Sequence, residues 1–179
     1  MSFIRTAALM LVAIAGCASG PRSSSETRDL SQRADATLTE MVARDPALHD
    51  QLGNAAAYAV FPNIGKGGVV VGGAYGEGIL YEHGRPTGYV SLKQASIGAQ
   101  LGGQTFAELL VLRNPVDIDR LKSGTYDVSA DASAVLLTAG AAATANLNAG
   151  SIVFIMPRGG LMVDISVAGQ KIDYQPLRG

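Results

Sequence analysis

Residues 55–114 read AAAYAVFPNIGKGGVVVGGAYGEGILYEHGRPTGYVSLKQASIGAQLGGQTFAELLVLRN, and this glycine-rich stretch decides the fold. Between residues 69 and 81 the odd positions are mostly bulky and the even positions are small. A period of two places these sets on opposite faces of one β-strand. The bulky residues are Val69, Val71, Tyr75, Ile79 and Tyr81, and the small residues are Gly72, Ala74, Gly76 and Gly78. The bulky face is expected to fill a core, while the glycine face lets another backbone, a helix or a ligand approach closely.

The residues that follow continue this sheet. Residues 83–88 (HGRPTG) are rich in turn formers and predict the loop of a hairpin. Residues 95–102 again alternate, and residues 109–112 form a continuous apolar run, which is typical of a strand buried on both faces. Glycine inside strands is destabilising, so its abundance here indicates sharp bending. We therefore expect an α+β fold with a mostly antiparallel sheet, strongly curved or closed into a small β-barrel, and N-terminal helices packed on it.

A helical pattern precedes the sheet. Residues 26–44 place apolar side chains near one stripe, at Leu30, Ala34, Leu38, Met41 and Val42. Such a helix could lie on a membrane. However, residues 26–45 hold five acids against three arginines, a poor match for an anionic bilayer surface. Packing against the sheet is therefore the better interpretation.

Two shorter helices are expected. Asp45 and Pro46 predict a helix start, with Asp45 as N-cap, Pro46 in the first turn and Gly53 as the C-cap candidate. Asn114 and Pro115 predict a second helix that Gly124 stops. The side chains of this second helix expected to dock on the sheet are Val116, Ile118 and Leu121.

The N-terminal residues have the pattern of a secretory signal. Arg5 supplies the charged region, and apolar residues 7–15 are too few to span a bilayer as a helix. Ile14-Ala15-Gly16-Cys17 resembles a bacterial lipobox, in which the cysteine receives lipid and becomes the first residue. The alternative is an ordinary cleaved signal with a chance cysteine, but the only cysteine of the chain falls at the one position that a lipobox needs. Ser19 is not the aspartate of inner-membrane retention, so the resemblance implies the outer membrane.

Residues 132–157 (ASAVLLTAGAAATANLNAGSIVFIMP) carry no charge. Their number suffices for a transmembrane helix, yet asparagines, threonines and glycines interrupt the apolar run. Bent strands that are rich in alanine and glycine are the preferred interpretation. A turn is expected at residues 158–160, followed by an alternating strand over residues 161–167 and a short final strand containing Ile172 and Tyr174.

Composition and motifs argue against several classes of protein. The formal net charge of -1 gives no electrostatic footprint for nucleic acid. One cysteine excludes an intramolecular disulfide and a multi-cysteine zinc site. The glycines form neither a dinucleotide fingerprint nor a P-loop, and no nucleophile elbow occurs. With only His49 and His83 as imidazoles, no triad or metal site is predicted, and neither an enzyme nor a cofactor is expected.

Several ordered blocks of the chain resemble the SYLF domain, also called the Ysc84 actin-binding domain. The first block is AVFP at residues 59–62, compared with the family's Ala-x-x-Phe-Pro opening. The others are the glycine-rich strand at 67–78, the Ser-x-Gly-x-Gln-x-Gly segment at 96–102, and MPRGGLMVDISVAGQKI at 156–172. The resemblance covers about residues 27–175. It implies lipid binding, because eukaryotic members bind phosphoinositide membranes and some bind actin.

Basic residues at predicted turns are the remaining polar feature, and they comprise Lys66, Arg85, Lys93, Arg113, Arg158 and Lys171. A charge in a loop is most often simply solvated. The functional interpretation is contact with lipid phosphates, since a cation near an anionic surface contributes about 1 kcal/mol. Lys66 and Arg158 have the strongest case, because each lies in a glycine-flanked turn within a SYLF-like block. Arg85 and Lys93 complete the candidate lipid-binding set.

These observations predict a signal peptide at residues 1–16, a lipidated tether at 17–25 and a SYLF-type domain at 26–179. Cys17 anchors the chain to a membrane, at the periplasmic or outer surface of the envelope. The domain is expected to bind anionic phospholipid or fatty acid without catalysis, and any protein partner is unknown. Two alternatives remain open: a structural envelope protein that binds another protein rather than lipid, and a hydrolase with unrecognised carboxylates.

Overall fold

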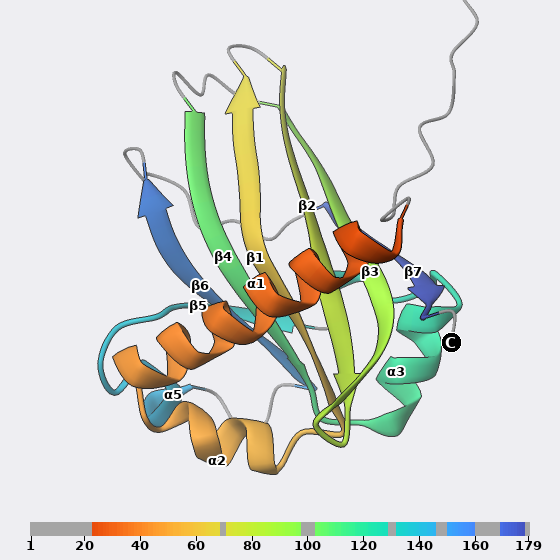
Figure 1. Ribbon diagram of the computed structural model, residues 1–179. Helices are drawn as coiled ribbons and strands as arrows, with labels where there is room; N and C mark the ends of the chain where they lie inside the picture. Colours follow the sequence, from red (N-terminus) through yellow and green to blue (C-terminus); the bar gives the residue numbers. More distant parts are fainter. Residues whose placement is uncertain are drawn as a thin grey trace, which may run out of the picture.

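The computed structural model describes residues 23–68, 71–97, 103–128, 132–145, 150–159 and 169–177 (Figure 1). The strands are β1 (Ala57–Gly68), β2 (Val71–Glu82), β3 (Arg85–Ile97), β4 (Gly103–Leu112), β5 (Ala132–Leu136), β6 (Ser151–Gly159) and β7 (Gln170–Pro176). The helices are α1 (Ser24–Arg44), α2 (Leu48–Gly53), α3 (Pro115–Lys122) and α5 (Ala141–Thr144). The predicted signal peptide, Cys17 and the strand expected over residues 161–167 lie outside the described residues.

The strands form one seven-stranded sheet in the order β5-β6-β4-β1-β2-β3-β7. Every pairing is antiparallel except that of β5 with β6, so the predicted α+β class and mostly antiparallel sheet are confirmed. The closed-barrel alternative is wrong, because among the described strands β5 and β7 are the edges of an open sheet. The hairpin between β2 and β3 is confirmed, with a tight turn in which His83 and Gly84 have φ of 52° and 73°.

The sheet carries buried residues on both faces. The α1-side core includes Leu30, Met41, Val60, Ile79, Leu109 and Phe154. The α3-side core includes Phe61, Ile64, Leu92, Leu110, Leu121 and Ile172. Strand β4 contributes Leu109 and Val111 to the first core and Leu110 and Leu112 to the second, as predicted for a strand buried on both faces.

The glycine-rich strand begins at Val71, because residues 65–68 belong to β1 and pair back on β2. The predicted close approach at its glycine face is confirmed at Gly76 and Gly78. A Cβ on Gly76 would lie 2.5 Å from Cγ1 of Ile64, and one on Gly78 would meet the carbonyl oxygen of Val60. The two glycines therefore accommodate the register shift of β1 between Val60 and Asn63. The bulky face fills the core at Ile79 and Tyr81, as expected, but not at Tyr75, which is 45% exposed.

Helix α1 starts with a capping box, in which Ser23 accepts from the N–H of Glu26 and the Glu26 carboxylate accepts from the N–H of Ser23. It crosses the sheet in Figure 1 and contacts β1 and β2. Of the predicted stripe, Leu30, Ala34 and Met41 are buried, and the other two members are partly buried. The hydroxyl of Tyr81 on β2 donates to the Asp35 carboxylate over 2.7 Å.

The short helices match their predictions in part. Helix α3 occupies the predicted segment, but Val116 is 65% exposed, so only Ile118 and Leu121 dock. Helix α2 starts at Leu48, later than predicted. Asp45 does not cap it, because its carboxylate accepts from the N–H of Ala47 at 3.2 Å and from the N–H of Ala142 at 2.7 Å. The buried carboxylate thereby ties the chain before α2 to α5.

Within the uncharged run of residues 132–157, residues 132–136 and 151–157 form strands, as preferred. The run contains β5, the short α5 and most of β6, whose residues from Ser151 to Met156 are buried. A transmembrane helix over this run is therefore wrong. No described helix has both the length and the apolar character that crossing a bilayer requires. Strand β7 contains the predicted final strand with Ile172 and Tyr174.

Candidate functional site

The α3-side face of the sheet carries an apolar row beside a polar row. The apolar row consists of register partners on β4, β1, β2, β3 and β7, which are, in that order, Phe106, Ile64, Gly76, Leu92 and Ile172. The polar row consists of the register partners that lie two positions away on the same five strands, which are, in the same order, Gln104, Lys66, Ala74, Gln94 and Gln170. Residues that pair directly across strands point to the same face of the sheet. Residues two positions apart in one strand also share that face, and they are about 7 Å apart. An apolar strip and a strip of amide and ammonium groups therefore lie next to each other.

The polar row is largely shielded from solvent. Lys66 is 5% exposed, Gln94 is 6% exposed and Gln170 is 2% exposed. Polar side chains are rarely buried to this extent unless they are paired. The row therefore concentrates hydrogen-bonding capacity in an interior where each group has a large effect.

Glu108 lies on the same face, opposite Phe61 and Ile155. Its side chain is fully buried, and Oε2 accepts a hydrogen bond of 3.1 Å from Nε2 of Gln170. Burial raises the pKa of Glu108 to about 7, although the hydrogen bond from Gln170 opposes the rise. A carboxyl group that exchanges its proton near neutral pH therefore lies inside the sheet.

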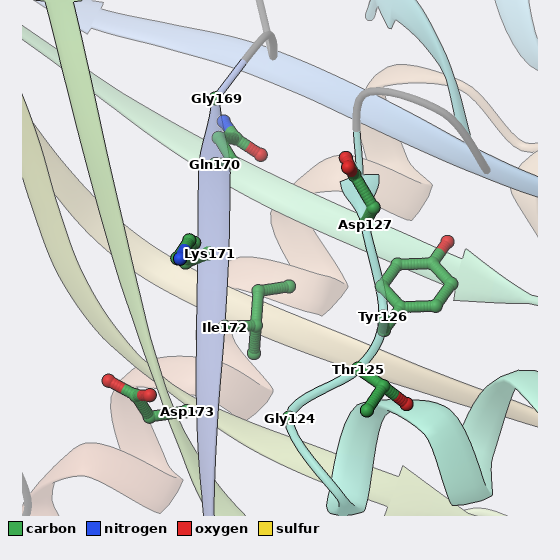
Figure 2. A pocket seen from close by; sticks show the side chains of 9 residues that line it. All are labelled: Gly124, Thr125, Tyr126, Asp127, Gly169, Gln170, Lys171, Ile172 and Asp173. Atoms are coloured by element: carbon green, nitrogen blue, oxygen red, sulfur yellow. The ribbon is translucent and has the colours of Figure 1, made fainter.

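A cleft of about 270 Å³ opens beside Gln170. Residues 124–127, which follow α3, form one wall, and residues 169–173 form the other. Figure 2 shows Gln170 and Ile172 projecting from β7 toward the segment with Tyr126, while Lys171 and Asp173 point away. The wall of the cleft thus combines an apolar side chain with the amide that bonds Glu108.

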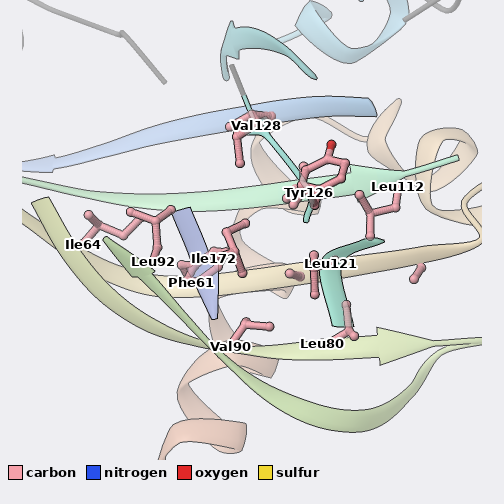
Figure 3. Packing of buried hydrophobic residues seen from close by; sticks show 14 of the residues in the cluster. Phe61, Ile64, Leu80, Val90, Leu92, Leu112, Leu121, Tyr126, Val128 and Ile172 are labelled. Carbon is pink, nitrogen blue, oxygen red and sulfur yellow. The ribbon is translucent and has the colours of Figure 1, made fainter. Parts of the chain in front are cut away.

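The cleft borders the α3-side core, because Tyr126 and Ile172 belong to both. Figure 3 shows Tyr126 and Val128 over the same core as Leu92 and Ile172. Tyr126 is 6% exposed, and Val128 is fully buried. The segment after α3 is therefore anchored by packing, so that it holds the outer wall of the cleft.

Lys66 does not lie in a turn, which corrects the prediction from its flanking glycines. It occupies β1, paired with Ala74 on β2 and Gln104 on β4. The glycine-rich sequence is regular strand here. Gly65 and Gly67, on either side of Lys66 in the chain, face open space on the opposite side of the sheet. Lys66 is the predicted lipid contact that the fold brings into the polar row.

Arg158 lies at the end of strand β6 rather than in the predicted turn, and it is bonded to neighbouring elements. Its Nε donates to the carbonyl of Pro62 at 3.0 Å, and Nη2 donates to Oγ1 of Thr37 at 2.9 Å. Its Nη1 pairs with the Glu40 carboxylate at 3.0 Å. Arg158 therefore connects β6 and β1 to α1, on the side of the sheet opposite the polar row.

The other two candidate cations are also separated from the polar row. Lys93 lies within β3 rather than in a turn, and its ammonium pairs with Asp173 on β7 at 2.8 Å. Arg85 is the first residue of β3, next to the hairpin turn, and it is exposed. The fold thus disperses the four predicted cations rather than forming one basic patch from them.

Replacing Arg158 with alanine is expected to loosen α1. Because the guanidinium bonds Pro62, Thr37 and Glu40 at once, its loss removes charge-assisted hydrogen bonds and should destabilise the chain by about 2 kcal/mol. Amide hydrogen exchange of α1 should accelerate in this variant. Arg85→Ala is the matched control, and its exchange should equal that of the wild type. Equal protection of α1 in both variants would contradict the assigned role.

A second cleft brings together the two histidines of the chain. His49 and His83 line a space of about 440 Å³, and its other lining residues are Leu52, Gly53, Ala55, Ala57, Tyr58 and Gly84. Tyr58 stacks on Tyr81 with ring centroids 5.0 Å apart. No group of three or more metal-ligating side chains occurs among the described residues. This cleft therefore lacks the donor set of a protein-bound metal.

The chain matches no model of a known protein family, and a search of curated proteins finds no match. The SYLF resemblance therefore remains a prediction from the quoted blocks.

Sequence reasoning missed Glu108 and Gln170. Glu108 is the lone acid in the strand TFAELLVL, and an acid within an otherwise buried strand is the signal that could have drawn attention to it. Gln170 carries no comparable signal, because its approach to Glu108 depends on tertiary structure.

Proposed function

We propose that this chain is an envelope lipoprotein whose folded domain binds an amphiphilic lipid, a phospholipid or an acyl chain, without catalysing a reaction. The observation that carries the proposal is the adjacency of the two rows on the α3-side face. The apolar row with Leu92 and Ile172 matches an acyl chain, and the buried polar row with Lys66 and Gln170 matches a headgroup. Ligand sites are commonly apolar with a few convergent polar groups.

We infer that the sheet curls strongly around this face. Strands β4 and β7 are separated by β1, β2 and β3 in the sheet order. At about 4.8 Å per strand, a flat sheet would hold them about 19 Å apart. Yet Gln170 on β7 donates to Glu108 on β4 over 3.1 Å, and α3 contacts both strands. These contacts support a curled sheet in which β4 and β7 approach each other over the α3-side core, next to the cleft at Gln170.

Lys66 is the candidate contact for an anionic headgroup. An ammonium with little exposure attracts a phosphate more strongly than a loop cation does, because salt and water screen it less. Arg158 and Lys93 are assigned to holding elements together, since each pairs with a carboxylate. Arg85 is exposed at the start of β3, so it is proposed only as a contact with lipid headgroups outside the two rows.

Binding of a monomeric short-chain phospholipid tests this function. Dihexanoyl phosphatidylglycerol should bind the full chain carrying Cys17→Ser, as measured by isothermal titration calorimetry. Lys66→Met keeps the length and removes the charge, so it should weaken this binding at least fivefold. Lys93→Met is the matched control on the opposite face and should bind as the wild type does. No binding by the starting chain, or equal affinity in both variants, would contradict the model.

Cys17 is proposed as the membrane anchor. Acyl chains inserted in a leaflet contribute about 0.8 kcal/mol per buried CH₂, so lipidation holds the chain on the membrane. Cys17→Ser is therefore expected to move the protein from the membrane fraction to the soluble fraction. Fractionation of expressing cells after a carbonate wash measures this. A mutant that still pellets with membranes would contradict lipid anchoring at this residue.

A further inference from the structure

Two buried oxygen atoms near the cleft accept no hydrogen bond. They are Oε1 of Glu108 and Oε1 of Gln170, and neither has a partner in the described part of the chain. The two side chains are joined through their other polar atoms, Oε2 of Glu108 and Nε2 of Gln170. Buried polar atoms are nearly always satisfied in folded proteins, so a pair of unsatisfied acceptors calls for a donor.

The position of Gln170 connects this pair to the surface. Gln170 is 2% exposed and lines the cleft beside Ile172 and Tyr126 (Figure 2). Glu108 lies behind it and is fully buried. Gln170 is therefore the member of the pair that borders the cleft, and it connects Glu108 to the apolar side chains there.

We propose that Glu108 and Gln170 form the end of the lipid site that receives a hydrogen-bond-donating headgroup, an ammonium or a hydroxyl. The inference rests on the proposed lipid binding and adds the chemistry of the ligand to it. The head donates to Oε1 of both side chains, and the apolar chain lies along Ile172 and Tyr126. When Glu108 is ionised, a free fatty-acid carboxylate is disfavoured at this end, because it would face two acceptors.

The charge of Glu108 fits this ligand. Burial holds its pKa near 7, with Gln170 as the hydrogen-bond donor that opposes the rise. An ammonium beside the carboxyl would favour the ionised form and lower that pKa. A hydroxyl would donate without adding charge. Other charged groups in this region are Lys66, on the same face of β1, and Asp127, on the opposite wall of the cleft. The guanidinium of Arg120 lies 5.8 Å from the centre of the Tyr126 ring, and Lys171 and Asp173 also border the cleft.

Three water-soluble probes of equal chain length test the proposal: hexylamine, hexanol and hexanoate. Each is titrated into the full chain carrying Cys17→Ser, and the ¹³C resonance of the Glu108 carboxyl is followed as a function of pH. Hexylamine or hexanol should bind and perturb this resonance, and hexylamine should also lower the pKa of Glu108. This measurement requires no substitution in the site.

Glu108→Gln should weaken hexylamine binding at least tenfold, because the amide loses the negative charge while it still accepts from Gln170. Glu77→Gln is the matched control, since Glu77 accepts from the exposed Tyr75. The affinity of Glu77→Gln for hexylamine should equal that of the starting chain. Hexanoate binding as tightly as hexylamine, or unchanged hexylamine binding in Glu108→Gln, would overturn the proposal.

The outcomes also separate this proposal from the proposed function. If dihexanoyl phosphatidylglycerol binds but no probe perturbs Glu108, the donor-headgroup site is overturned and lipid binding stands. If neither the phospholipid nor any probe binds, both are overturned.

Discussion

Gly76→Val is expected to destabilise the chain by about 3 kcal/mol, at the upper end of the usual effect of overpacking. The added Cβ would lie 2.5 Å from Cγ1 of Ile64 and 3.0 Å from the carbonyl oxygen of Asn63. Ile64 is fully buried in the α3-side core, so its side chain has little space to turn away. The Asn63 oxygen belongs to the backbone and can move only with the strand. Urea denaturation measures the loss.

Gly65→Val is the matched control on the neighbouring strand. A Cβ on Gly65 would meet nothing within 4 Å, and the residue is exposed. Valine also favours strands, so this variant should be as stable as the wild type or more stable. If both variants unfold at the urea concentration of the wild type, the close approach of β1 to Gly76 is wrong.

The stability of the domain should fall as pH rises from about 4.5 to about 7. The pKa of Glu108 is raised from 4.5 to about 7 in the folded chain, so the folded state holds the proton that the unfolded state releases in this window. The stabilisation is complete below 4.5 and lost as pH rises through 7. At about 1.4 kcal/mol per pKa unit, the loss amounts to about 3 kcal/mol.

Glu108→Gln should remove this contribution, because glutamine is neutral at every pH and still accepts from Gln170. Urea denaturation at pH 4.5 and pH 8 compares the two proteins. The control Glu77→Gln should retain the slope of the wild type. A wild type that is equally stable at both pH values, or a Glu108→Gln variant with the same slope, would contradict a buried, protonated Glu108.

Local patterns predicted most of the elements. The spacing of Leu30, Ala34 and Met41 indicated α1, and the apolar run of β4 indicated a strand buried on both faces. His83 and Gly84 adopt positive φ in the predicted hairpin. These features depend on residues that are near each other in the sequence, so they can be predicted from it.

The errors arose where the glycines allowed more than one arrangement. Gly67 and Gly68 belong to β1, and they pair with Gly73 and Gly72 at the start of β2. Without bulky side chains to mark a face, the sequence did not reveal this reversal. The same ambiguity placed Lys66 in a turn, although it lies within a strand.

The candidate site depends on contacts between distant segments, so the sequence predicted little of it. Gln170 meets Glu108 across 62 positions of the chain. Arg158 was singled out for its flanking glycines, but its partners Thr37 and Glu40 lie in α1. Charge alone could not distinguish a cation that binds a ligand from one that holds a helix.

The lipid content of the purified protein tests the central claim most directly. The Cys17→Ser chain, isolated without detergent from the periplasm, should carry a non-covalently bound lipid in near-stoichiometric amount by native mass spectrometry and lipid extraction. Lys66→Met, purified in parallel, should carry less. A Cys17→Ser chain that is free of lipid, or one that co-purifies with a protein partner instead, would contradict lipid binding.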